Sequence, residues 1–224
     1  MKTMRRTMTL LVAILFCTTL ISAQNLSEYR NFSLGTNLIQ LAKQVDEKPA
    51  DASAIHQRPA LIQELTWWPV QSYQSPEPSE PVQEIRFGFY NGELYRMVVT
   101  YDQQATAGMT ADDMVRAVST LYGTATRPAA EINFPTKAFY NSEEKVIARW
   151  QDSEDSVSLF RANGLDSFGL VVLSKRLDAA AGAAIVESVK LDKEEAPQKE
   201  AARQKNEANS LAAERQIHRE TFRP

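Results

Sequence analysis

Apolar residues recur at helical spacing in two separate segments of the chain. The segment 32–46, FSLGTNLIQLAKQVD, carries Leu38, Leu41, Ala42 and Val45. The segment 106–125, TAGMTADDMVRAVSTLYGTA, carries Met114, Val115, Val118 and Leu121. Steps of three and four residues place such side chains on one side of a helix, so each segment predicts a short amphipathic helix.

Both predicted helices have a similar start signal. Asn37 and Thr110 are N-cap residue types, and each follows a glycine by two positions, Gly35 and Gly108. Asp113 stands three residues after Thr110, where a capping-box side chain is expected. The two segments therefore resemble each other in the turn that precedes the helix as well as in the apolar pattern.

Runs typical of β-strands follow each helix. After the first helix they lie at 60–68 and 82–102, and after the second at 145–152, 156–163 and 167–174. The strongest local signal is Asn91-Gly92 between two alternating runs, which predicts a hairpin with a type I′ turn.

A two-residue turn at Asn91-Gly92 predicts which hairpin side chains share a face. The face expected to pack on the helix carries Ile85, Phe87, Phe89, Leu94 and Val98. The opposite face is expected to carry Glu84, Arg86, Tyr90, Glu93, Tyr95, Met97, Val99 and Tyr101.

The order of elements predicts an α+β fold with two tandem units, each a short helix followed by antiparallel strands, and a C-terminal helical tail. The expected divisions are a signal peptide at 1–23, a first unit at 24–105, a second unit at 106–175 and a charged helical tail at 176–224. The competing interpretation is that two short amphipathic helices look alike by chance.

Two motifs carry a family resemblance that covers roughly residues 32–174. They are the capped-helix phrase of residues 108–114, GMTADDM, and the hairpin phrase of residues 89–94, FYNGEL. These phrases resemble the helix-then-sheet unit of the β-lactamase-inhibitor proteins and of the small lipoprotein of the outer-membrane β-barrel assembly machinery. The resemblance implies a fold and binding through a sheet face, and it transfers no functional residue.

The N-terminus has the three parts of an export signal. Residues 1–9 contain Lys2, Arg5 and Arg6, an apolar run spans 10–21, and Ala23 closes an acceptable cleavage site. Phe16 precedes Cys17, the only cysteine, where a lipoprotein signal has a small residue. We expect export to the periplasm or the extracellular space and no stable membrane span after cleavage; a retained N-terminal anchor is the alternative.

Composition excludes several kinds of chemistry. Removal of residues 1–23 leaves 22 basic and 28 acidic residues and no cysteine, so neither a basic nucleic-acid surface nor a disulfide framework is expected. The two histidines, His56 and His218, lie far apart in the sequence, and no catalytic or phosphate-binding motif is present. We predict a non-enzymatic protein without metal or cofactor, although carboxylates such as Glu64 and Glu84 can meet only through the fold.

Residue types that dominate protein interfaces gather on the face predicted to lie opposite the helix. The candidate partner-binding residues are Trp67, Trp68, Arg86, Tyr90, Tyr95, Met97 and Tyr101. The expected partner is another protein of the bacterial envelope. The alternatives are that the tail helix or the second unit covers this face, that the protein carries a small ligand or glycan, or that it is an enzyme of unrecognised type.

The tail is rich in Ala, Glu, Lys, Gln and Arg, which are good helix formers. The first half is expected to dock on the domain through Ala180, Ala184, Val186, Val189 and Leu191. Beyond Pro197 large apolar residues are scarce, which favours a solvated helix; a partner-binding or dimerising helix is the alternative. The sequence leaves the oligomeric state open.

Overall fold

The computed structural model describes residues 25–69, 81–127, 131–132, 144–161 and 167–223. The expected signal peptide at 1–23 and parts of four loops, at 70–80, 128–130, 133–143 and 162–166, lie outside these residues. The elements in chain order are β1 (Glu28–Tyr29), β2 (Phe32–Ser33), α1 (Leu38–Gln44), the 3₁₀ turn η1 (Pro49–Asp51), β3 (Ser53–His56), β4 (Ile62–Trp67), β5 (Val82–Tyr90), β6 (Glu93–Tyr101), α2 (Ala111–Tyr122), β7 (Glu131–Ile132), β8 (Glu144–Gln151), β9 (Asp155–Arg161), β10 (Phe168–Ser174) and α3 (Lys175–Thr221).

One antiparallel sheet of eight strands unites the two predicted units. Its strand order is β3-β4-β5-β6-β10-β9-β8-β7, so the last strand of each unit meets the last strand of the other at the centre. The predicted α+β class, with two tandem helix-and-strand units and a helical tail, is confirmed. We call strands β3 to β6 the first half of the sheet and strands β7 to β10 the second half.

The helix starts form as their sequences predict. The Asn37 side chain accepts a hydrogen bond from the backbone of Gln40, which begins α1. Thr110 and Asp113 exchange side-chain-to-backbone bonds of 3.2 and 2.9 Å and complete a capping box at the start of α2. These bonds satisfy N–H groups that have no partner within the helix.

The hairpin between β5 and β6 contains an irregularity that the alternating pattern conceals. Asn91 and Gly92 both have positive φ, +50° and +83°, as a type I′ turn requires. Phe89 then pairs with Leu94, but Gly88 pairs with Arg96, so Tyr95 is an extra residue in β6. This β-bulge reverses the alternation for the rest of the strand.

Because of the bulge, the side chains of β6 beyond Tyr95 lie on the opposite faces from those predicted. Phe87 pairs with Met97 and Ile85 with Val99, and all four side chains lie in the main core. Met97 and Val99 are therefore core residues, and the prediction that they point away from the core is wrong. Val98, predicted to face the core, lies in a separate cluster on the opposite side of the sheet.

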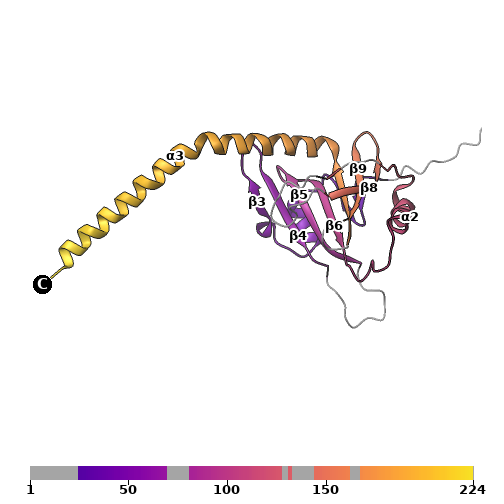
Figure 1. Cartoon of the computed structure of the whole chain (residues 1–224), viewed down its shortest axis with the longest axis horizontal. Helices are drawn as coiled ribbons and strands as arrows, with labels where there is room; N and C mark the ends of the chain where they lie inside the picture. The colour runs from indigo at the N-terminus through magenta and orange to yellow at the C-terminus, as the bar shows by residue number, and fades with distance from the viewer. Residues whose placement is uncertain (1–24, 70–80, 128–130, 133–143, 162–166, 224) are drawn as a thin grey trace, which may run out of the picture.

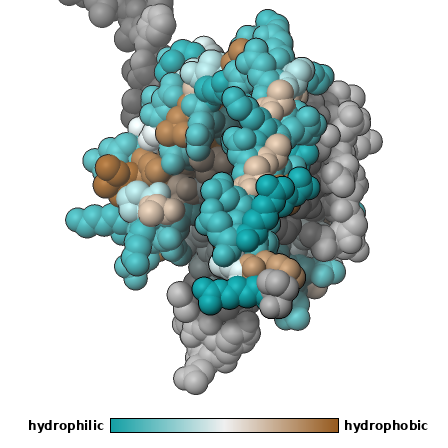
Figure 2. Space-filling view, turned by 90° about the vertical axis from the view of Figure 1, so that its left-hand side faces the viewer, coloured by the Kyte–Doolittle hydropathy of each residue, from teal (hydrophilic) through white to brown (hydrophobic). Residues whose placement is uncertain are grey.

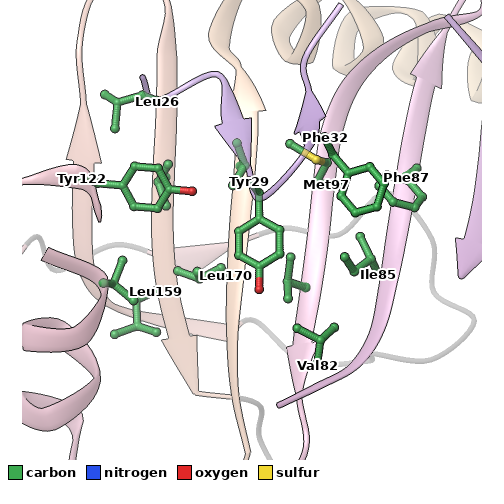
Figure 3. Close-up of a cluster of buried hydrophobic side chains, with 14 of the residues drawn as sticks. Leu26, Tyr29, Phe32, Val82, Ile85, Phe87, Met97, Tyr122, Leu159 and Leu170 are labelled. Atoms are coloured by element: carbon green, nitrogen blue, oxygen red, sulfur yellow. The ribbon is translucent and has the colours of Figure 1, made fainter. Parts of the chain in front are cut away.

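The main core lies between the sheet and a layer made of α1, α2 and the β1–β2 hairpin. Figure 3 shows Leu26, Tyr29 and Phe32 from the N-terminal segment among side chains of the sheet and of α2. The Phe32 ring meets Phe87 edge-on at 4.9 Å between centroids. Full burial of one such apolar side chain stabilises the fold by about 1.5–3 kcal/mol, so this short segment is an integral part of the core.

The helix α3 begins directly after the central strand β10 and crosses the strands of the first half at one end (Figure 1). Its first part docks on the sheet through Leu177, Ala181, Ala184 and Ser188, which are buried. Residues 196–222, here called the arm, extend beyond the domain, and every side chain of the arm is exposed.

Pro197 lies inside α3 at the start of the arm. A proline within a helix removes one backbone hydrogen bond and favours a bend, and α3 changes direction after it leaves the sheet (Figure 1). Among the described residues, none of the helices combines the length and the hydrophobicity that a membrane span needs.

Candidate functional site

The candidate site is the face of the sheet that lies opposite α1 and α2, here called the outer face. It carries Glu64 and Thr66 of β4, Glu84 and Arg86 of β5, and Tyr95 and Arg96 of β6, as strand pairing and the two core clusters place them. Tyr95 and Arg96 share this face because the bulge places both opposite Gly88.

One end of the outer face is covered by α3. Leu177 and Ala181 form a buried cluster with Tyr95 and Ile62, with Tyr90 packed at its margin. Ala181 is a small residue, which lets a helix approach the sheet closely. The alternative that the tail helix covers the aromatic face is thus confirmed for Tyr95, which is 2% exposed.

Three polar contacts fasten α3 across the first half of the sheet. Arg96 of β6 donates to Asp178 at 2.9 Å, and the Ser188 hydroxyl lies 2.9 Å from Nδ1 of His56 in β3. Arg58, in the β3–β4 loop, makes a two-pronged ion pair with Glu195. The hydrogen bond from Arg58 lowers the pKa of Glu195 to about 2.

The sequence does not predict these fastening residues, and it predicts the docked side of α3 only in part: Ala184 is buried as expected. Val186 and Val189, expected to dock, are 72% and 45% exposed. The docked side is set by the angle at which α3 leaves β10, and it runs through Leu177, Ala181, Ala184 and Ser188. The spacing of four, three and four residues was the available signal, and the polar Ser188 obscured it.

Most of the seven candidate partner-binding residues do not form one exposed surface. Met97 and Tyr95 are buried on opposite faces of the sheet, and Arg86 is 5% exposed. Trp67, Tyr90 and Tyr101 are half-buried, with Trp67 and Tyr101 against the main core. The prediction of a broad aromatic face is therefore wrong in its geometry, and Trp68 is the member that remains well exposed, at 61%.

Tyr101 belongs to a tyrosine group on the core side of the sheet. Burial raises the pKa of Tyr101 well above its usual value, and the neighbouring Tyr29, hydrogen-bonded to it, raises it further. The Tyr122 hydroxyl donates to the backbone oxygen of Glu28 at 2.7 Å. These contacts tie the N-terminal segment to β6 and α2, which indicates a structural role for Tyr101.

The part of the outer face beyond α3 carries a charge network. The Arg86 Nε lies 3.5 Å from a carboxylate oxygen of Glu84, and Arg86 also acts electrostatically on Glu64 of the neighbouring strand. Burial raises the pKa of Glu64, Arg86 lowers it, and Glu84 raises it. The two carboxylates named from the sequence as a possible pair are thus close enough to interact, with a cation beside them.

Trp68 follows β4 directly. Trp67 pairs with Ile85 and packs toward the core, where its ring meets Phe32 at 5.6 Å between centroids. Adjacent residues of an extended chain point to opposite sides, so Trp68 is directed away from the core, at the level of Glu84. An exposed tryptophan is typical of binding surfaces.

Large apolar patches are absent from the face drawn in Figure 2. Among its coloured residues hydrophilic side chains dominate, and hydrophobic ones form small separate groups. Within the described residues, no three His, Cys, Asp or Glu side chains gather as metal ligands.

Comparison with known proteins adds no relative. No family model, no curated protein and no solved structure matches this chain. The resemblance to the β-lactamase-inhibitor and assembly-lipoprotein families therefore stays a prediction, and the functional argument depends on the geometry of the outer face.

Proposed function

We propose that this is an exported, non-enzymatic binding protein of the bacterial envelope, and that its binding surface centres on Trp68. The single observation that carries the proposal is the 61% exposure of Trp68, directly after the strand that carries Glu64. Tryptophan combines a large apolar area with an N–H donor, which makes it a frequent hot spot at interfaces.

The charge network supports the same surface. Arg86 is 5% exposed and lies between two acidic side chains, so its position is fixed by the sheet. Fixed charges on a binding face favour partners of complementary charge and reject others. The partner would be another envelope protein that presents an apolar pocket with hydrogen-bonding groups at its rim.

The N-terminal sequence supports export. Residues 1–23 carry a basic start, an apolar run and a small residue at their end, and the remaining chain has no cysteine that oxidation could affect. The partner would therefore be encountered in the periplasm or outside the cell.

A photo-cross-linking residue at Thr66, two positions before Trp68 on the outer face, tests the proposal with Trp68 in place. We expect one discrete cross-linked product in cells, suppressed by an excess of the unmodified protein but not by the Trp68→Ala variant. The matched control places the cross-linker at Leu121, which is 60% exposed on α2. Equal products from both positions, or suppression by Trp68→Ala as strong as by the unmodified protein, would contradict the proposal.

An enzyme remains a second candidate because of one observation, the raised pKa of Glu64 near Glu84. A carboxylic acid with a raised pKa beside a second carboxylate is the pair used in glycoside hydrolysis. The two functions separate by assay: an enzyme would hydrolyse a glycan substrate and lose that activity in Glu64→Gln, whereas a binding protein would hydrolyse no glycan in its parent form.

A further inference from the structure

The arm is the largest part of the described chain that packs against nothing else in it. All of residues 196–222 are exposed, including Leu211 at 53% and Phe222 at 76%. At 1.5 Å per residue, a helix of this length extends roughly 39 Å. Isolated helices are marginal in water, and most helices in proteins are stabilised by packing of one side.

The sequence of the arm follows a heptad pattern over three successive heptads. Alternating steps of three and four residues bring one set of side chains to a common side of the helix: Ala201, Gln204, Ala208, Leu211, Arg215, His218 and Phe222. We call this side the seam. Leu211 and Phe222, two of the exposed apolar residues of the arm, both lie in it, whereas Ile217 lies outside it.

Charges flank the seam with opposite signs on its two sides. One side carries Glu200, Glu207 and Glu214, spaced by seven residues. The other side carries Lys205 and Arg219, which are separated by two steps of seven residues. Such flanking positions decide partner and orientation when two helices pair.

The flanking charges favour one arrangement of two identical arms. In a parallel pair, Glu200 meets Lys205 of the second copy and Glu214 meets Arg219 of the second copy. In an antiparallel pair each acidic flank faces the other acidic flank, which is repulsive. The chain's own arm is thus complementary in charge to a second parallel arm.

We propose that the arms of two copies of this chain associate as a short parallel coiled coil over residues 201–222. Pro197 precedes the coil and allows the two domains to diverge from it. Gln204, Arg215 and His218 in the seam weaken the pair but fix its register. The dimer is therefore concentration-dependent and weakens as salt screens the flanking charges.

Within one chain, Arg203 already pairs with Glu200 at 2.9 Å and lies 3.9 Å from Glu207. Those contacts compete with the intermolecular pair at Glu200, so the pair between Glu214 and Arg219 is the more informative one to change. The proposal does not rest on the surface at Trp68, because the arm is remote from that end of β4 (Figure 1).

Sedimentation equilibrium of the purified chain at low and high salt tests the proposal. We expect a monomer–dimer equilibrium that Glu214→Lys and Arg219→Glu each weaken by roughly 10-fold, and that the double charge swap restores. Leu211→Ser should abolish it, and Ile217→Ser, equally exposed but outside the seam, should leave it unchanged. A monomer at every soluble concentration, or equal effects of the two serine variants, would overturn the proposal.

Cysteine cross-linking reports the orientation. In a Cys17→Ser background, oxidation of Ala201→Cys should give a covalent dimer, because parallel arms bring the two positions together. Ala213→Cys, on the outside of the arm, is the matched control. A dimer through position 213 but not through position 201, or through neither, would contradict the parallel arrangement.

Discussion

The two halves of the sheet are built from the same elements, yet they are stabilised differently. In the second half, Trp150 of β8 is 2% exposed and donates from its indole nitrogen to the Gly123 backbone oxygen at 2.9 Å, just after α2. In the first half, Trp67 holds the corresponding place in β4 but is only half-buried. The first half instead gains α3 on its outer face.

The difference shows how two similar units can be supported from different sides of one sheet. The second half has a buried tryptophan that bonds to the residue directly after α2. The half with the shorter helix α1, seven residues against twelve, is supported from the other side by α3. That second layer buries Tyr95, while it leaves Trp68 exposed at the other end of the outer face.

The largest expected effect comes from removal of the two tryptophans in turn. Trp150→Ala should lower the free energy of unfolding by about 3–5 kcal/mol, because a fully buried ring and its hydrogen bond are lost. Trp67→Ala should cost clearly less, since part of that ring is already solvated. Urea unfolding of both variants measures the difference, and equal losses would show that the two halves are equally anchored.

A second comparison uses two glycines that lie beneath aromatic rings. A Cβ at Gly169 of β10 would lie 2.3 Å from the Phe160 ring and 2.8 Å from the backbone oxygen of Val99. A Cβ at Gly88 of β5 would lie 3.2 Å from the Tyr95 ring. We expect Gly169→Ala to destabilise the protein by about 1–3 kcal/mol through overpacking, and Gly88→Ala by less.

Thermal and urea unfolding of the two alanine variants distinguish these expectations. A Cβ at Gly169 would meet a backbone oxygen as well as a ring, both closer than 3.0 Å, whereas a Cβ at Gly88 would meet only side-chain atoms, of Tyr95 and Arg96, at 3.2 Å or more, so a small side-chain shift relieves it. A larger loss at Gly88 than at Gly169 would show that the bulge is the more rigid site.

Helix capping gives a smaller effect with a defined pH dependence. Thr110→Ala removes one half of the capping box and should cost about 1 kcal/mol. Hydrogen bonds from Thr110 lower the pKa of Asp113, so this contribution is present above the ordinary aspartate pKa and disappears as pH falls through the lowered value. The cap of α1, Asn37, has no carboxylate partner of this kind. The loss of stability in Asn37→Ala should therefore depend less on pH.

The smallest expected effect is a gain of stability in Glu64→Gln. Burial raises the pKa of Glu64, so the folded state binds more protons than the unfolded state just above the ordinary glutamate pKa. The folded state therefore disfavours the charged form of Glu64, and the contribution of Glu64 to the free energy of unfolding falls as pH rises. The variant should be slightly more stable than the parent at neutral pH and no more stable in acid; a loss at neutral pH would indicate that the Arg86 interaction outweighs burial.

Local signals in the sequence determined the helices, the β5–β6 hairpin and the longer strands, but not the short strands β1, β2, β3 and β7. Asn37, Thr110 and Asp113 cap the helices through side chains a few residues away, and Asn91-Gly92 forms its turn through its own backbone preferences. The order of helix and strands determined the α+β class. None of these requires knowledge of distant residues, because each interaction spans only a few positions of the chain.

Only the tertiary structure decided which of the candidate side chains are exposed. The Tyr95 bulge, which sends Met97 and Tyr101 into the core, depends on the pairing of β6 with both β5 and β10. The burial of Tyr95 depends on the direction in which α3 leaves β10, which brings Leu177 and Ala181 against the Tyr95 ring. These outcomes arise from contacts between residues far apart in the chain, which local periodicity does not encode.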